Sequence, residues 1–127
     1  MTTTVDTAAA QAAREILAAV DSGDVDALLR HVTDDIRLQF GNAEVVTGRS
    51  AFEAAARALV QSIAAIRHEL LELWEVEGGT VIAVMMVHYK RLDGQELSLP
   101  CCNLMGTRAG RVHDYRVYMD INPVFAA

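Results

Sequence analysis

Three apolar strands follow one another between residues 81 and 120 and constrain the fold more than any other feature. They cover 81–90, 96–106 and 111–120, and the breaks between them carry Asp93-Gly94 and Ala109-Gly110. Asp-Gly between two apolar runs predicts a tight hairpin, because both residues accept the positive φ of a primed turn. A meander this apolar has two faces to cover, so the rest of the chain is expected to supply the cover.

The preceding segments predict two helices and a first strand. Residues 7–20 form an apolar helical face that ends at the turn Asp21-Ser22-Gly23, and Asp24 is placed to cap a second helix. Residues 36–40 alternate apolar and polar side chains, which is typical of a half-buried strand. The apolar face of the first helix comprises Ala9, Ala13, Ile16, Leu17 and Val20, and that of the second comprises Val25, Leu28, Leu29 and Val32.

A third helix and a fourth long strand complete the pattern. The sequence Ser50-Ala51-Phe52-Glu53 has the form of a capping box, so a helix is expected from Ser50 to about residue 65. A short strand at 44–47 precedes it, and a long strand at 66–77 follows. Gly78-Gly79 then turns the chain into the strand at 81. This order predicts an α+β domain with three N-terminal helices on one face of a curved, mostly antiparallel sheet, a cone-shaped α+β barrel.

Length and composition favour one domain over residues 1–127, with residues 1–6 expected to be disordered. The net charge is −6 and the 11 Lys and Arg residues are scattered, which argues against nucleic acid or an anionic membrane as a partner. No apolar run is long enough to cross a bilayer and no signal peptide is recognisable, so a cytoplasmic location is expected. The hydrophobic fraction of 52% favours an enclosed pocket or a subunit interface.

Sequence motifs indicate no metal site and no cofactor. Cys101 and Cys102 are adjacent, so they point to opposite faces of a strand and are interpreted as small core residues. The four histidines lack metal-ligand spacing, and there is no phosphate loop, nucleophile elbow or dinucleotide fingerprint.

Several short motifs, taken in order, resemble the nuclear-transport-factor-2-like superfamily, in its SnoaL-like and ketosteroid-isomerase-like branch. They are AVDSGDVDALL at 19–29, TDD at 33–35, TGR at 47–49, GRV at 110–112 and YRVYMD at 115–120. The resemblance implies a cone of sheet and helices around an apolar pocket, a small apolar molecule as ligand, and a homodimer formed through the outer sheet face.

The catalytic residues of that branch are absent from the positions that the resemblance assigns to them. The Asp base of ketosteroid isomerases corresponds to Phe40, and the two oxyanion-hole residues correspond to Ile16 and Cys102. The Asp on the last strand of epoxide-hydrolase-like and SnoaL-like enzymes corresponds to Val117. The hydrolases' Arg and Asp belong on the strand at 81–89, which offers only His88.

Strand parity provides the remaining site candidates. The last strand turns Tyr115, Val117 and Met119 inward, and Tyr115 becomes either a hydrogen-bond donor to a ligand or a core tyrosine bonded to a backbone carbonyl. Counting back from Asp93-Gly94 pairs Met85 with Cys102. A one-residue error in that turn or a bulge would reverse the faces. The predicted ligand-binding residues are Phe40, Met85, Val87, Tyr89, Cys102, Val117 and Met119.

His88 and Asp120 join Tyr115 as the predicted catalytic residues. His88 is the best general-base candidate by chemistry, although the same parity places it on the opposite face with Cys101 and Leu99, where a dimer interface could also explain it. Asp120 either acts as an acid or base at the mouth of the cone or caps the C-terminal turn. His68 and Trp74 are predicted to share one strand face.

Two functions from different classes remain open at this stage. The first is a cofactor-free isomerase, cyclase or dehydratase that moves protons on a polyketide-like or steroid-like molecule. The second is a non-catalytic ligand-binding or dimerisation domain, which the loss of the family's catalytic residues would explain.

Overall fold

The computed structural model describes residues 7–126, so the expected disorder of residues 1–6 lies outside the described part. Four helices and six strands are present, and their order is as follows. They are α1 (Ala8–Ser22), α2 (Val25–Leu29), β1 (Val32–Phe40), β2 (Val46–Thr47), α3 (Arg49–Ser62), β3 (Ala65–Val76), β4 (Thr80–Lys90), β5 (Glu96–Arg108), β6 (Arg111–Tyr118) and α4 (Asn122–Phe125).

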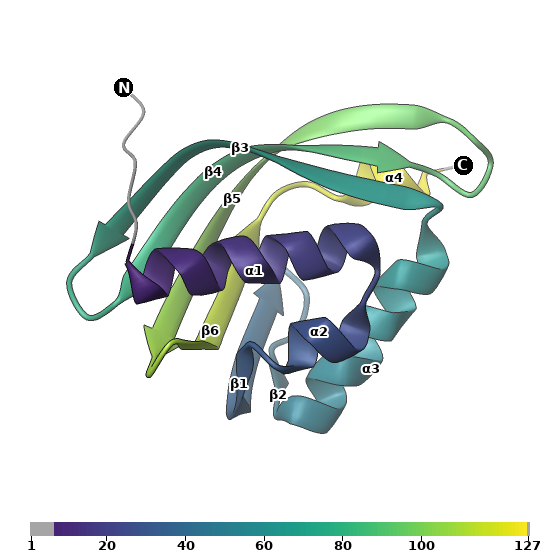
Figure 1. Cartoon of the computed structure of the whole chain (residues 1–127). Helices are drawn as coiled ribbons and strands as arrows, with labels where there is room; N and C mark the ends of the chain where they lie inside the picture. Colours follow the sequence, from purple (N-terminus) through teal and green to yellow (C-terminus); the bar gives the residue numbers. More distant parts are fainter. Residues whose placement is uncertain (1–6, 127) are drawn as a thin grey trace.

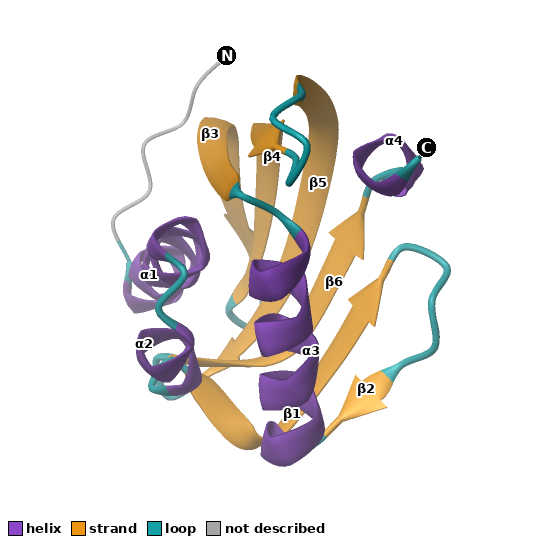
Figure 2. Cartoon of the chain, turned by 90° about the vertical axis from the view of Figure 1, so that its right-hand side faces the viewer, coloured by secondary structure: helices purple, strands orange, loops and turns teal. Residues whose placement is uncertain are grey.

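A single curved sheet has the strand order β2-β1-β6-β5-β4-β3. All neighbours are antiparallel except β1 and β6, which are parallel. The sheet bends over α1, and α1, α2 and α3 cover its concave face (Figures 1 and 2). The predicted α+β class is therefore confirmed, with the short α4 as a fourth helix and with an open sheet.

The first two helices begin where the sequence predicts. The Thr7 hydroxyl accepts a hydrogen bond from the Ala10 amide at 3.1 Å, and the Asp24 carboxylate accepts one from the Ala27 amide at 3.0 Å. Gly23 ends α1 in the left-handed conformation with φ 70°, which a residue with a Cβ adopts only at a cost. Its N–H satisfies a carbonyl of the last helical turn, so both ends of α1 have hydrogen-bond partners.

The predicted capping box at the start of α3 is wrong. The helix begins one residue earlier than expected, at Arg49, and its N-cap is Gly48, which has no side chain to form a cap. The Gly48 N–H donates to the Ile36 carbonyl at 2.8 Å, and its carbonyl accepts from the Phe52 N–H at 3.0 Å. This backbone link between β1 and α3 sets the helix start, so Ser50 lies inside the first turn.

The turn between β4 and β5 is longer than predicted, and this shifts the pairing by one residue. Only Gly94 of the loop has positive φ, and the Gly94 N–H donates to the Arg91 carbonyl at 3.0 Å. This is a three-residue loop rather than a two-residue primed turn. Met85 consequently pairs with Cys101, so the prediction that Met85 shares a face with Cys102 is wrong.

A bulge in β3 overturns a second parity prediction. The pairing with β4 shifts between Leu70 and Glu72, so one extra residue lies in β3. His68 pairs with the buried Val87, whereas Trp74 pairs with Ile82 on the outer face. His68 and Trp74 therefore lie on opposite faces, because an inserted residue reverses the alternation of all that follow.

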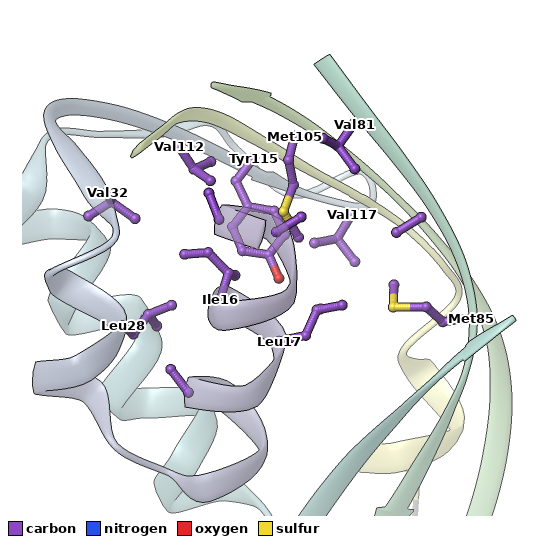
Figure 3. Packing of buried hydrophobic residues seen from close by; sticks show 14 of the residues in the cluster. Ile16, Leu17, Leu28, Val32, Val81, Met85, Met105, Val112, Tyr115 and Val117 are labelled. Carbon is purple, nitrogen blue, oxygen red and sulfur yellow. The ribbon is translucent and has the colours of Figure 1, made fainter. Parts of the chain in front are cut away.

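The hydrophobic core lies between the concave sheet face and α1 (Figure 3). Ile16 of α1 and Met105 of β5 are both fully buried, and they meet among valines from β4 and β6. In the part of the chain that the structure describes, no helix is long and apolar enough to cross a membrane.

The turn between β5 and β6 provides a test of backbone strain. Ala109 is the one non-glycine residue with positive φ among residues 7–126, at 53°. Ala109→Gly should increase the free energy of unfolding by about 0.5–1 kcal/mol, because glycine adopts this conformation without a Cβ clash. The same substitution at the exposed Ala58 in α3 should lower it by about 1 kcal/mol. Chemical denaturation measures both, and equal signs would contradict the account.

Candidate functional site

A cavity of about 320 Å³ lies between the concave sheet face and the helices. Its wall is almost entirely apolar, with contributions from α1, α2, α3 and every strand of the sheet. Ala43 and Glu44 in the β1–β2 loop and Phe125 in α4 line the cavity and are also exposed, so the cavity opens beside them. The polar residues of the lining are Asp24, Glu44, His68, Tyr89, Cys101, Asn103 and Tyr115.

His68 lines the cavity and is held by Asp21. The Nδ1 atom of His68 lies 2.5 Å from Asp21 Oδ1, and the backbone N–H of His68 is 3.0 Å from each carboxylate oxygen. Asp21 comes from the last turn of α1 and His68 from β3, so the pair joins the end of the helix to the edge strand of the sheet. The His68 side chain is only 9% exposed.

This pairing leaves one nitrogen of His68 free to act in the cavity. An ionised carboxylate only accepts hydrogen bonds, so Nδ1 carries the proton and Nε2 of the neutral ring is an acceptor. Nε2 has no hydrogen-bond partner among residues 7–126. Every fully buried side-chain nitrogen and oxygen in this part of the chain is bonded, so Nε2 contacts open space.

A second polar chain runs from β5 to β6 across the cavity wall. The Cys101 thiol donates to Asn103 Oδ1 at 3.4 Å, and Asn103 Nδ2 donates to the Tyr115 hydroxyl at 3.4 Å. Asn103 is 1% exposed and is the one buried polar residue of the described core. Because the Tyr115 oxygen accepts from Asn103, its own proton remains available for donation. Figure 3 shows this hydroxyl pointing from the sheet toward α1.

The environment keeps both cavity phenols protonated. Burial raises the pKa of Tyr115 well above its usual value of 10.0, and the neighbouring Cys101 and Asp21 add to the increase. Burial likewise raises the pKa of Tyr89, whose hydroxyl donates to Met119 Sδ at 3.5 Å. Both phenols are therefore hydrogen-bond donors at neutral pH and not bases.

The structure places most of the predicted ligand-binding residues in the cavity wall. Met85 and Val87 are fully buried in the core and are not part of this wall. Cys102 faces outward because of the shifted β4–β5 register, and Cys101 takes its place. The residues that do line the cavity are Phe40, Tyr89, Val117 and Met119, together with Tyr115.

His88 lies on the outer face of the sheet, as its parity predicted, and does not line this cavity. Its neighbours there differ from those expected, because the register pairs it with Ser98. Nδ1 is 2.6 Å from Ser98 Oγ, and Nε2 is 2.8 Å from Glu69 Oε1. A base on this face cannot contact a molecule in the cavity.

Asp120 is exposed and does not line the cavity either. Its Oδ1 accepts a hydrogen bond from the Asn122 N–H at 3.0 Å, at the turn into α4. This is the capping role that the sequence left open as the alternative to acid–base chemistry.

Sequence reasoning missed the Asp21–His68 pair, although both residues carried a signal. Asp21 lies at the C-terminal end of α1, where the helix dipole disfavours a negative charge, so a compensating partner was to be expected. His68 alternates with Arg67 and Glu69 and shares the parity of the apolar Ile66. Within residues 7–126, no group of three His, Cys, Asp or Glu side chains is placed to hold a metal ion.

A sequence model of the SnoaL-like domain matches residues 13–115 of the chain. Among curated proteins, none matches the chain at a significant level.

Solved structures with the same fold cover nearly the whole chain. An NTF2-like protein of unknown function from Burkholderia pseudomallei is 17% identical, with TM-score 0.84 over 95% of this chain and 100% of that one. An LEH-like epoxide hydrolase from M. tuberculosis is 16% identical (TM-score 0.79, 93% and 86% covered). A protein with a ketosteroid-isomerase-like fold from Catenulispora acidiphila, in complex with trimethylamine, is 14% identical (TM-score 0.81, 90% and 88% covered). At these identities the likeness concerns the fold.

The cavity thiol provides a test of this environment. Burial raises the pKa of Cys101 from 9.0 to about 12, and the adjacent Cys102 adds to the increase. At pH 8 the folded protein should therefore contain about 10³-fold less Cys101 thiolate than the unfolded chain. In a Cys102→Ala variant, alkylation by iodoacetamide should be slower by about this factor before denaturation than after it. The rate in the folded protein should increase tenfold per pH unit up to about pH 12. Equal rates in folded and unfolded protein at pH 8 would refute this.

Proposed function

Because the chain belongs to the SnoaL-like domain family, we propose that it is a cofactor-free enzyme that moves a proton on an apolar small molecule bound in the cavity. The reaction class is isomerisation, cyclisation or dehydration. The observation that carries this proposal is the Asp21–His68 pair, which presents an unprotonated ring nitrogen to an otherwise apolar cavity.

His68 is the general base in this proposal. Its Nε2 takes a proton from a carbon next to a carbonyl group, and the electron pair of the broken C–H bond moves onto the carbonyl oxygen. Asp21 is a positioning residue, because it holds Nδ1–H and stabilises the imidazolium that forms. The proton returns from Nε2 to another carbon of the same molecule, or assists a leaving group, so no redox partner is needed.

Tyr115 is the donor to the developing oxyanion. Its hydroxyl stays protonated and accepts from Asn103, so its proton can point to the ligand oxygen. A donor fixed in a dry cavity stabilises negative charge more than water does, because it does not reorganise during the step. The roles that the resemblance assigned to Phe40, Ile16, Cys102 and Val117 thus fall to other residues of this chain.

Exchange of carbon-bound protons tests the assignment of His68 without knowledge of the natural substrate. The protein is incubated with 2-tetralone in D2O, and deuterium incorporation next to the carbonyl is followed by proton NMR. His68→Asn should reduce the protein-catalysed rate by about 10²–10⁴-fold, because it removes the base. His88→Asn makes the same substitution on the outer sheet face and should leave the rate unchanged.

Asp21→Asn should reduce the exchange rate by about 10²-fold and shift its pH profile, because the ring loses its fixed orientation and its negative neighbour. A change in stability alone would not move the pH profile. If the His68 and His88 variants exchange at the same rate, His68 is not the base. The apolar wall favours one alternative, a non-catalytic ligand-binding domain, which would bind 2-tetralone and give no exchange above buffer.

A further inference from the structure

The charged residues of the cavity wall all have the same sign. The 26 lining residues include the carboxylates of Asp24 and Glu44 and no lysine or arginine. A third carboxylate, Asp21, lies directly behind His68. A cavity that bound carboxylate or phosphate groups would be expected to contain a cation, because Arg and Lys are the usual partners of such groups.

We propose that this site selects uncharged molecules and rejects anions, so that its substrate is a neutral carbonyl compound rather than a free acid or a phosphate ester. This inference rests on the proposed function and names the substrate class of the same site. The selection arises from the absence of a cation in the lining and from the carboxylates beside it.

The hydrogen-bond donors of the cavity are too few to hold an anion. Tyr115 offers one O–H proton, and the Asn103 amide already donates to Tyr115. His68 presents an acceptor at Nε2, because Nδ1 holds the proton that faces Asp21. An anion that leaves water for this cavity would therefore lose its hydration without regaining equivalent contacts, which is costly in an apolar environment.

Three side chains of the wall already show this resistance to negative charge. Burial raises the pKa of Cys101, Tyr89 and Tyr115, and each group lines the same cavity from a different strand. A bound carboxylate would meet the same desolvation and the same neighbouring charges. A neutral carbonyl oxygen avoids this cost, since it needs only the single donor that Tyr115 provides.

A matched pair of dyes tests the charge selection. N-Phenyl-1-naphthylamine is uncharged, and 8-anilino-1-naphthalenesulfonate has the same ring skeleton with one sulfonate. Fluorescence titration at pH 8 should give saturable binding of the neutral dye with a dissociation constant at least about tenfold lower than that of the sulfonate. The preference should weaken with added salt, which screens the carboxylates at the mouth.

A cation introduced at the mouth should reverse the effect. Ala43 is exposed and lines the cavity, whereas the adjacent Asn42 is exposed and does not line it. Ala43→Lys should tighten sulfonate binding about fivefold or more and leave the neutral dye unchanged. Asn42→Lys changes the net charge equally and should leave both dissociation constants within about twofold of the original protein.

The result that overturns the proposal is a sulfonate dissociation constant within about threefold of that of the neutral dye. Equal responses to Ala43→Lys and Asn42→Lys, or no saturable binding of the neutral dye, overturn it as well. None of these measurements depends on turnover. His68→Asn should retain the dye preference, so a failure of charge selection is distinguishable from a failure of the proton-transfer proposal.

Discussion

The contact between Asp21 and His68 determines how the helices and the sheet enclose the cavity. A carboxylate at the C-terminal end of α1 is unfavourable beside the helix dipole, yet it accepts the backbone N–H and the ring Nδ1–H of His68. Those bonds hold the end of the helix against β3, the edge strand of the sheet, and the ring is thereby fixed with one nitrogen toward the cavity. Charge-assisted hydrogen bonds of this kind are stronger than neutral ones, so a single interaction provides both the attachment and the oriented base.

Two irregularities in the strands decide which side chains reach the cavity. The extra residue between Leu70 and Glu72 turns His68 inward and Trp74 outward, and without it the two would share a face. The three-residue loop before β5 turns Cys101 inward and Cys102 outward. The polar groups of the cavity, namely His68 on β3, the Cys101–Asn103 pair on β5 and Tyr115 on β6, therefore depend on backbone register more than on composition.

The parts of the fold that could be predicted from the sequence are those fixed by local chemistry. Thr7 and Asp24 cap helices as expected, and Ala109-Gly110 makes the two-residue turn with both φ angles positive. The start of α3 could not be predicted, because the Gly48 backbone bonds to Ile36 across the fold instead of to a side chain nearby. Tyr115, Phe40 and Val117 lie in the cavity wall where strand parity put them, whereas Asp21 and His68 are 47 residues apart and meet only through tertiary structure.

The state of the His68 ring tests this account most directly. Nitrogen-15 NMR of histidine-labelled protein, with the His68 signals assigned by comparison with a variant that lacks this residue, reports which ring nitrogen carries the proton. The account predicts a neutral ring protonated at Nδ1, with a slowly exchanging, strongly deshielded proton in the hydrogen bond to Asp21, and an unprotonated Nε2. A ring protonated at Nε2, or one that averages between the two tautomers as free imidazole does, would contradict it.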